Sequence, residues 1–342
     1  MDNILGKKRF YLPFALVLVA LLLIGGGLLA TKVWNPSWNP FGGGATKVIE
    51  DAFAKTNGAK SFKMEGEINA EAETEGKFLT VGIVFSEDVD KKEAENPKTA
   101  GEFKIKLGIE GMTLEVKSEI IGTNKDVYFR LTSLPAIPLL SGLDLTAFKN
   151  QWYKISSEEL KAINNVGEGS FDYKKFAEEL VNLLKDKEVF KIEKNFGVEE
   201  IKGEKATHYR TSLKKKTVKE FIPSFLDLAG KYTPAEQQEN YQQQLKTFLQ
   251  NFSKNFEEAW SRIEPLNFDF WLADGYLKEL KFEKEFVYES TEKKGEMNKI
   301  KIAVNLFFSG FNEKLTIEPP KNFKTLKDIL SVLGNFLPTE SQ

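Results

Sequence analysis

The chain is dominated by segments in which apolar and polar residues alternate with a period of two. Residues 62–73 show this most clearly: every second residue from Phe62 to Ala72 is apolar or glycine, and the residues between them are charged or amidic. Such alternation is typical of a strand with one buried and one solvated face. The same pattern predicts antiparallel strands in residues 79–85, 103–109, 114–116, 127–131, 152–155, 188–194, 197–213, 266–286 and 300–308, with a two-residue hairpin turn at Asp274-Gly275.

Helical spacing interrupts this alternation. It predicts amphipathic helices in residues 46–57, 171–186, 217–264 and 326–333. Capping-box patterns begin at Thr217 and at Thr233, and a one-sided apolar stripe runs from Tyr241 to Trp260. Strands and helices together predict one α+β domain over residues 46–338, in which amphipathic helices cover a large curved antiparallel sheet, with a helical insertion at about 217–264.

The N-terminal residues have a different character. A basic patch within residues 1–9 precedes the uncharged residues 10–30, a length that crosses a ~30 Å hydrocarbon layer as one helix. The positive-inside tendency places residues 1–9 in the cytoplasm and the domain after the 31–45 linker outside the cell membrane. A cleaved signal peptide is the alternative, but Leu28 is not small, as the cleavage site requires.

Composition excludes several classes of function. The chain has 48 basic and 50 acidic residues and a net charge of −2, so it carries no electrostatic signature of nucleic-acid binding. Cysteine is absent, which excludes thiolate metal sites, cysteine nucleophiles and lipid acylation of a cysteine. The 28 phenylalanines instead indicate a large apolar interior.

Motifs for catalysis or cofactor binding are missing. His208 is the only histidine, so any Ser-His-Asp triad would have to use it, and no nucleophile-elbow, zinc-protease or nucleotide-binding pattern is present. The acidic stretch 87–95 lacks the spacing of a calcium loop and is interpreted as a solvated turn. The lysine run at 214–219 is interpreted as a solvated surface, although anionic headgroups are an alternative. We therefore expect no enzyme activity and no cofactor.

The sheet and its several helices offer more apolar surface than one compact pair of layers needs. A sheet curled into a half-barrel, with helices over its mouth, would leave a cavity for apolar ligands. Burial in the domain's own core is the simpler interpretation of the same apolar faces.

The order of elements resembles the LolA-like and mycobacterial LppX/LprG-like carrier families. The residues that carry the resemblance are the G-x-K-A-T-H-Y segment at 203–209 and the F-W-L-A-D-G-Y-L-K segment at 270–278. The resemblance implies a half-barrel sheet capped by helices around a cavity for acyl chains or lipidated molecules. Two features depart from these families: no acylated cysteine anchors the chain, and a tethered protein cannot diffuse as a LolA-like shuttle does.

We therefore expect a membrane-anchored, extracytoplasmic, non-enzymatic protein that binds lipid or lipidated molecules in a hydrophobic cavity. A structural or sensory envelope ectodomain with a filled core, binding a protein or polymer, is the alternative. Lipid hydrolysis through His208 is a third. The residues expected to line the cavity are Phe103, Ile105, Leu107, Leu114 and Val116 from the sheet and Phe221, Phe225, Phe248 and Phe252 from the helices.

Overall fold

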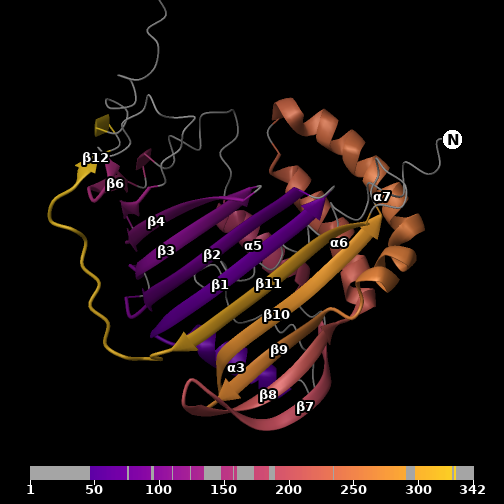
Figure 1. The fold of residues 1–342 in the computed structure, drawn as a ribbon, viewed down its shortest axis with the longest axis horizontal. Helices are drawn as coiled ribbons and strands as arrows, with labels where there is room; N and C mark the ends of the chain where they lie inside the picture. Colours follow the sequence, from indigo (N-terminus) through magenta and orange to yellow (C-terminus); the bar gives the residue numbers. More distant parts are fainter. Residues whose placement is uncertain are drawn as a thin grey trace, which may run out of the picture. The chain divides into compact units, whose positions relative to one another are not determined.

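The computed structural model describes residues 47–74, 77–93, 96–109, 111–123, 125–134, 148–156, 158–159, 173–184, 189–233, 235–289, 297–325 and 327–328. Within them, twelve strands form an open, mostly antiparallel sheet in the order β12-β6-β5-β4-β3-β2-β1-β11-β10-β9-β8-β7 (Figure 1). The predicted span 10–30, the linker 31–45 and most of the predicted C-terminal helix lie outside the described residues. Of the helices in these ranges, none is long and apolar enough to cross a membrane.

Two compact units make up the chain, and the first contains most of the predicted meander. This meander unit comprises residues 60–69, 78–166 and 308–342. Its strands pair as antiparallel neighbours, except that the short β12 lies parallel to β6. The strands are β1 (Ser61–Thr74, whose last residues belong to the other unit), β2 (Lys77–Asp90), β3 (Lys98–Ile109), β4 (Met112–Gly122), β5 (Asp126–Ser133), β6 (Trp152–Ser156) and β12 (Lys324–Thr325).

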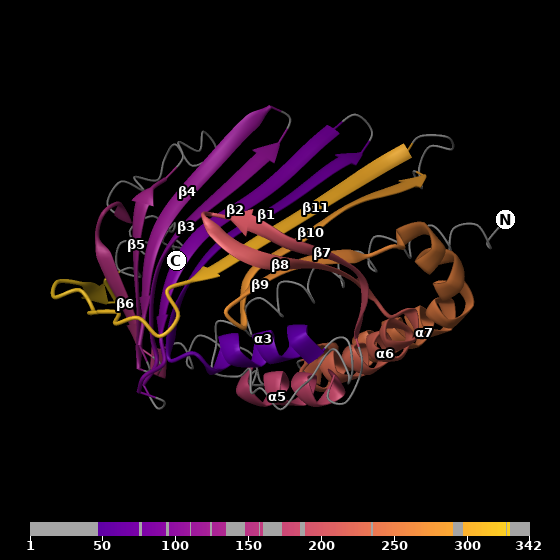
Figure 2. The same cartoon turned by 90° about the horizontal axis from the view of Figure 1, so that it is seen from below.

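The second, helical unit comprises residues up to 59, 70–77 and 167–307. Its helices all lie on the same side of its strands β9 to β11 (Figure 2). The elements are α3 (Lys47–Gly58), α5 (Tyr173–Leu184), β7 (Phe190–Ile201), β8 (Glu204–Leu213), α6 (Lys215–Lys231), α7 (Ala235–Ile263), β9 (Asn267–Ala273), β10 (Tyr276–Glu289) and β11 (Met297–Ser309).

The contacts of helix α3 with β9 and β10 include an aromatic pair and a buried hydrogen bond. Phe53 meets Phe270 edge-on, with ring centroids 5.5 Å apart. The backbone N–H of Leu277 donates to the Thr56 hydroxyl at 2.8 Å, and both residues are buried. This bond satisfies an N–H that has no solvent to donate to.

The predicted hairpin between β9 and β10 is confirmed. Asp274 and Gly275 both have positive φ, 53° and 75°, as a two-residue turn of the favoured hand requires. The predicted boundary between the strands at 188–194 and 197–213 was wrong. The first of these strands, β7, continues to Ile201 instead of stopping at residue 194. Gly197, at φ 86°, accommodates a bulge within the strand, and the turn comes later, at Lys202 and Gly203.

Two further sequence interpretations were wrong. β2 runs on to Asp90, so the first residues of the acidic stretch 87–95 belong to a strand and not to a turn. Helix α6 begins at Lys215 after an N-cap at Lys214, so Thr217 lies inside the helix and does not cap it. In both cases the pairing and packing of the longer element outweighed a local signal.

Candidate functional site

One face of β2, β3 and β4 is mostly apolar, with Ser118 of β4 as the polar member of the row that contains Phe85 and Phe103. The antiparallel register aligns its side chains in four cross-strand rows, because Leu79, Val81, Ile83 and Phe85 of β2 pair in turn with residues of β3. The three strands thus present alternate residues on the same side. This apolar face consists of Leu79, Val81, Ile83 and Phe85 from β2, Phe103, Ile105, Leu107 and Ile109 from β3, and Met112, Leu114 and Val116 from β4.

None of these eleven side chains is buried. The exposed fractions are 45% for Ile105, 44% for Ile109, 43% for Leu79 and 57% for Met112. A contiguous exposed apolar surface of this kind marks a binding site more often than a scattered hydrophobic residue does. The apolar face is therefore the best candidate for a ligand-binding surface in the meander unit.

The opposite face of the same strands is polar. Glu115 of β4 pairs there with Lys106 at 3.7 Å and with Lys117 at 3.3 Å. Glu119 pairs with Arg130 of β5. The strands therefore have one solvated, ion-paired face and one apolar face whose side chains are exposed or half-buried in the described part of the chain.

The five sheet residues predicted to line a cavity lie together on the apolar face. Ile105 pairs with Val116 and Leu107 with Leu114, in adjacent rows. The ring of Phe103 stacks on that of Phe85, with centroids 5.9 Å apart. Sequence alternation predicted which residues of each strand share a face, and the pairing of β3 with β4 brings them together.

The four predicted helical residues lie in the other unit. Phe221 and Phe225 stack at 5.8 Å in a buried cluster with Leu180 of α5 and Leu228 of α6. On α7, Phe248 and Phe252 also stack at 5.8 Å, and Phe252 is buried. That the sheet and helix residues line one cavity stays a prediction.

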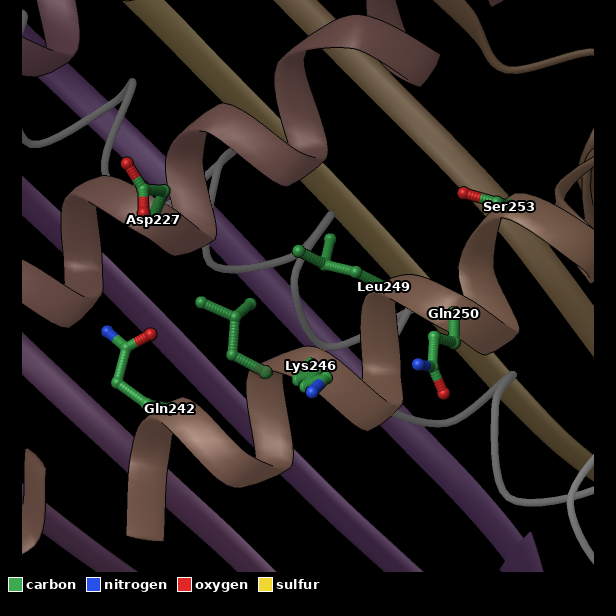
Figure 3. Close-up of a pocket in the computed structure, with 7 residues that line it drawn as sticks. Asp227, Gln242, Lys246, Leu249, Gln250 and Ser253 are labelled. Atoms are coloured by element: carbon green, nitrogen blue, oxygen red, sulfur yellow. The ribbon is translucent and has the colours of Figure 1, made fainter. Parts of the chain in front are cut away.

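A groove of about 570 Å³ lies between α6 and α7. Figure 3 shows Asp227 of α6 across this groove from Gln242 and Leu249 of α7. The described residues that line it are Asp227, Gln242, Leu245, Lys246, Leu249, Gln250 and Ser253. Five of these seven residues are polar, but most of the surface that lines the groove is apolar, and none of the predicted wall phenylalanines is among them.

Glu87 lies at the end of the apolar face and was missed as a site residue. It follows Phe85 on the same side of β2, pairs with Gly101 of β3, and hydrogen-bonds to Thr99. Burial raises the pKa of its carboxyl from 4.5 to about 7, and the bond from Thr99 opposes this shift. Val89, which continues the apolar alternation beyond Glu87, was the signal in the sequence that β2 extends this far.

His208 is held in a closed cluster on β8. Its ring is stacked between those of Phe196 and Trp271, with centroid distances of 4.4 and 4.1 Å. Its Nδ1 lies 3.1 Å from Glu199 and its Nε2 lies 2.9 Å from Asp269. With 6% of the residue exposed and both nitrogens engaged, the cluster is built as a structural clamp between strands.

The carboxylates of this cluster are also engaged by other donors. Arg210 donates two hydrogen bonds to Asp269, at 2.8 and 2.9 Å. Burial opposes ionisation of Asp269, but the bonds from Arg210 and His208 outweigh it and lower the pKa of the carboxyl. In the part of the chain that the structure describes, no group of histidine and carboxylate residues is arranged to hold a metal ion.

No protein-family model matches the chain, and no curated protein matches it. Among solved structures, the chain is similar to LprF from Mycobacterium bovis, at 14% identity and a TM-score of 0.35, over 81% of this chain and 96% of that one. It is also similar to the lipoprotein LppX from Mycobacterium tuberculosis, at 12% identity and a TM-score of 0.29, over 80% and 97% of the two chains. LppX belongs to one of the two carrier families that the sequence resembles. A DUF1329 family protein from Desulfovibrio piger is similar at 9% identity and a TM-score of 0.18, over 80% of this chain and 92% of that one.

Proposed function

We propose that this protein binds the acyl chains of lipids or lipidated molecules on the apolar face of β2, β3 and β4. The observation that carries the proposal is the exposure of that face, where eleven apolar side chains are in register and none is buried. From Leu79 to Phe85 the face spans about 20 Å along the strand, which suits an extended hydrocarbon chain.

The binding needs contact area and no catalytic group. Burial of hydrocarbon contributes about 0.8 kcal/mol per CH₂, so a chain of about 16 carbons gains on the order of 10 kcal/mol before ordering costs. His208, the one histidine, is enclosed by its stacking rings and carboxylates, so the triad that lipid hydrolysis would require has no available base. These two properties support the proposal of a non-enzymatic binding protein.

The proposal places the domain outside the cell membrane and tethers it through residues 10–30. This part rests on the uncharged length of that segment and on the basic patch before it. A tether would keep the ligand-binding domain beside the membrane from which an acyl chain is taken.

Photocrosslinking of the full-length chain tests the proposal. The protein, held in phospholipid nanodiscs, is irradiated with hexadecanoic acid that carries a diazirine on its chain, and the adducts are located by mass spectrometry of peptides. We expect the adducts on β2, β3 and β4, and a several-fold loss of them in Ile105→Asp, which places a charge in the middle of the face.

Val84→Asp is the matched control. Val84 lies on the opposite face of β2. Its exposed fraction of 37% is similar to the 45% of Ile105. Its substitution should leave the adducts unchanged, and circular dichroism should show that both variants are folded. Equal adducts in the two variants, or adducts confined to other elements, would overturn the proposal and favour the filled-core ectodomain.

A further inference from the structure

The apolar face ends at a single carboxyl group. Beyond the row formed by Phe85 and Phe103, the next residues on the same side are Glu87 of β2, Gly101 of β3 and Ile120 of β4. Because Gly101 has no side chain, the Glu87 carboxyl has no side-chain neighbour at its paired position on β3. Along the strands, the carboxyl comes directly after the rings of Phe85 and Phe103. A ligand chain that lies along the strands, crossing the rows one after another, therefore has one end next to Glu87.

The Glu87 carboxyl can donate a hydrogen bond when it is protonated. The residue is half-buried, and its pKa of about 7 keeps a large part of the carboxyl protonated at neutral pH. Thr99 donates to one of its oxygens, the bond that would otherwise favour the charged form. A protonated carboxyl in a mainly apolar site can donate its O–H to an acceptor on a ligand.

We propose that Glu87 and Thr99 form a polar subsite at the end of the apolar face, which binds an uncharged acceptor oxygen, such as an ester carbonyl, at the end of an acyl chain. The subsite rests on the proposed function, because it needs the chain to lie on the apolar face. It deepens that function by selecting ligands with an acceptor over plain hydrocarbons of the same length.

The charges near this subsite are few. Lys91, just past the end of β2, is the titratable side chain nearest in sequence on this side, and its ammonium lies 5.1 Å from the centre of the Phe62 ring of β1. From β3, the partners on this face are the uncharged Thr99 and Gly101. Burial and Thr99 are the causes that shift the pKa of Glu87, without a contribution from a charged neighbour.

Matched ligands test the subsite. The full-length chain, held in an amphipathic polymer, is titrated with radiolabelled methyl hexadecanoate or heptadecane, which differ in the ester group, at pH 6 and pH 9. At pH 6 we expect a preference of about three- to tenfold for the ester, the worth of one hydrogen bond. At pH 9 the ionised carboxyl cannot donate, so the preference should disappear.

Variants separate the subsite from the rest of the face. Glu87→Leu should lose the preference at both pH values and still bind heptadecane, whereas Glu87→Gln, which keeps an N–H donor, should retain the preference at pH 9. Glu115→Gln, on the polar face of β4, should behave as the parent protein. Because all proteins are measured in the same polymer, partitioning of the probes into it cancels.

Each outcome decides between the two ideas. Equal binding of ester and alkane by the parent at pH 6, or an unchanged preference in Glu87→Leu, would overturn the subsite and leave the proposed function standing. Binding of neither probe would overturn both. If Glu87→Leu does not fold, the pH 9 comparison between the parent and Glu87→Gln decides the question, and loss of the preference in both would count against the subsite.

Discussion

Replacing Glu87 with Gln should stabilise the protein at alkaline pH. The folded protein raises the pKa of this carboxyl to about 7, whereas in the unfolded chain it titrates near 4.5. Below pH 4.5 both states are protonated and the carboxyl costs nothing. As pH rises from 4.5 to 7, the unfolded state releases its proton first, so this group's contribution to folding becomes steadily less favourable.

The magnitude follows from the same two pKa values. A difference of one in pKa corresponds to about 1.4 kcal/mol, so above pH 7 the group lowers the free energy of unfolding by about 3 kcal/mol. Gln has nearly the same shape, can still accept from Thr99, and does not ionise. Glu87→Gln should thus be more stable than the parent by up to about 3 kcal/mol at pH 8.5 and nearly equal to it at pH 4.5.

Urea unfolding of the full-length chain, followed by tryptophan fluorescence at several pH values, measures both quantities. Glu115→Gln is the control, since the hydrogen bond from Lys117 lowers the pKa of that exposed carboxyl. Any pH effect of the control should therefore appear at acidic and not at alkaline pH. Equal stability of Glu87→Gln and the parent at pH 8.5 would refute the reasoning, because it would mean that the Glu87 carboxyl ionises without cost.

Three further predictions concern the helical unit. His208→Leu removes the ring whose two nitrogens lie within hydrogen-bond distance of Glu199 and Asp269, so urea unfolding at pH 7 should show a loss of about 2–4 kcal/mol; a loss below 0.5 kcal/mol would contradict a structural role of the cluster. The folded protein lowers the pKa of Asp269, so the ionised carboxyl stabilises the fold above pH 4 and this effect is lost as pH falls. In Asp269→Asn, the free energy of unfolding should therefore decline less steeply below pH 4. The same decline in the variant and the parent would contradict this prediction. Thr56→Val leaves the buried N–H of Leu277 without its acceptor and should cost about 1–3 kcal/mol, whereas Thr56→Ser should cost less; equal losses would show that the hydroxyl contributes nothing.

The period-two pattern was sufficient to predict most of the strands and the face that each one presents. The five sheet residues expected to line a cavity share a face because alternation determines which side of a strand a residue occupies. Register is set by pairing between strands that are distant in the sequence. For this reason the alternation alone could not show that Ile105 lies opposite Val116, or that Phe85 stacks on Phe103.

Glu87 shows where a local reading of polarity fails. In the sequence it opens an acidic stretch, and acidic residues near a strand end usually lie in solvated turns. Pairing of β2 with β3 continues to Asp90, so Glu87 lies within the strand, on the same side as the apolar face. The environment of a carboxyl, and with it the pKa, depends on how far the strand pairing extends, which is a tertiary property.

The strands β2, β3 and β4 that would bind a ligand also contain side chains that lower the stability of the ligand-free protein. The apolar face leaves side chains such as Ile105 and Met112 exposed, and the Glu87 carboxyl at its end costs about 3 kcal/mol once it is ionised. A ligand present at about 100 times its dissociation constant adds about 2.7 kcal/mol of stability, a contribution of the same size. Ligand binding on the apolar face can therefore offset the cost of ionising Glu87. We expect the protein to be least stable without ligand above pH 7, where the apolar side chains are exposed and the Glu87 carboxyl is ionised.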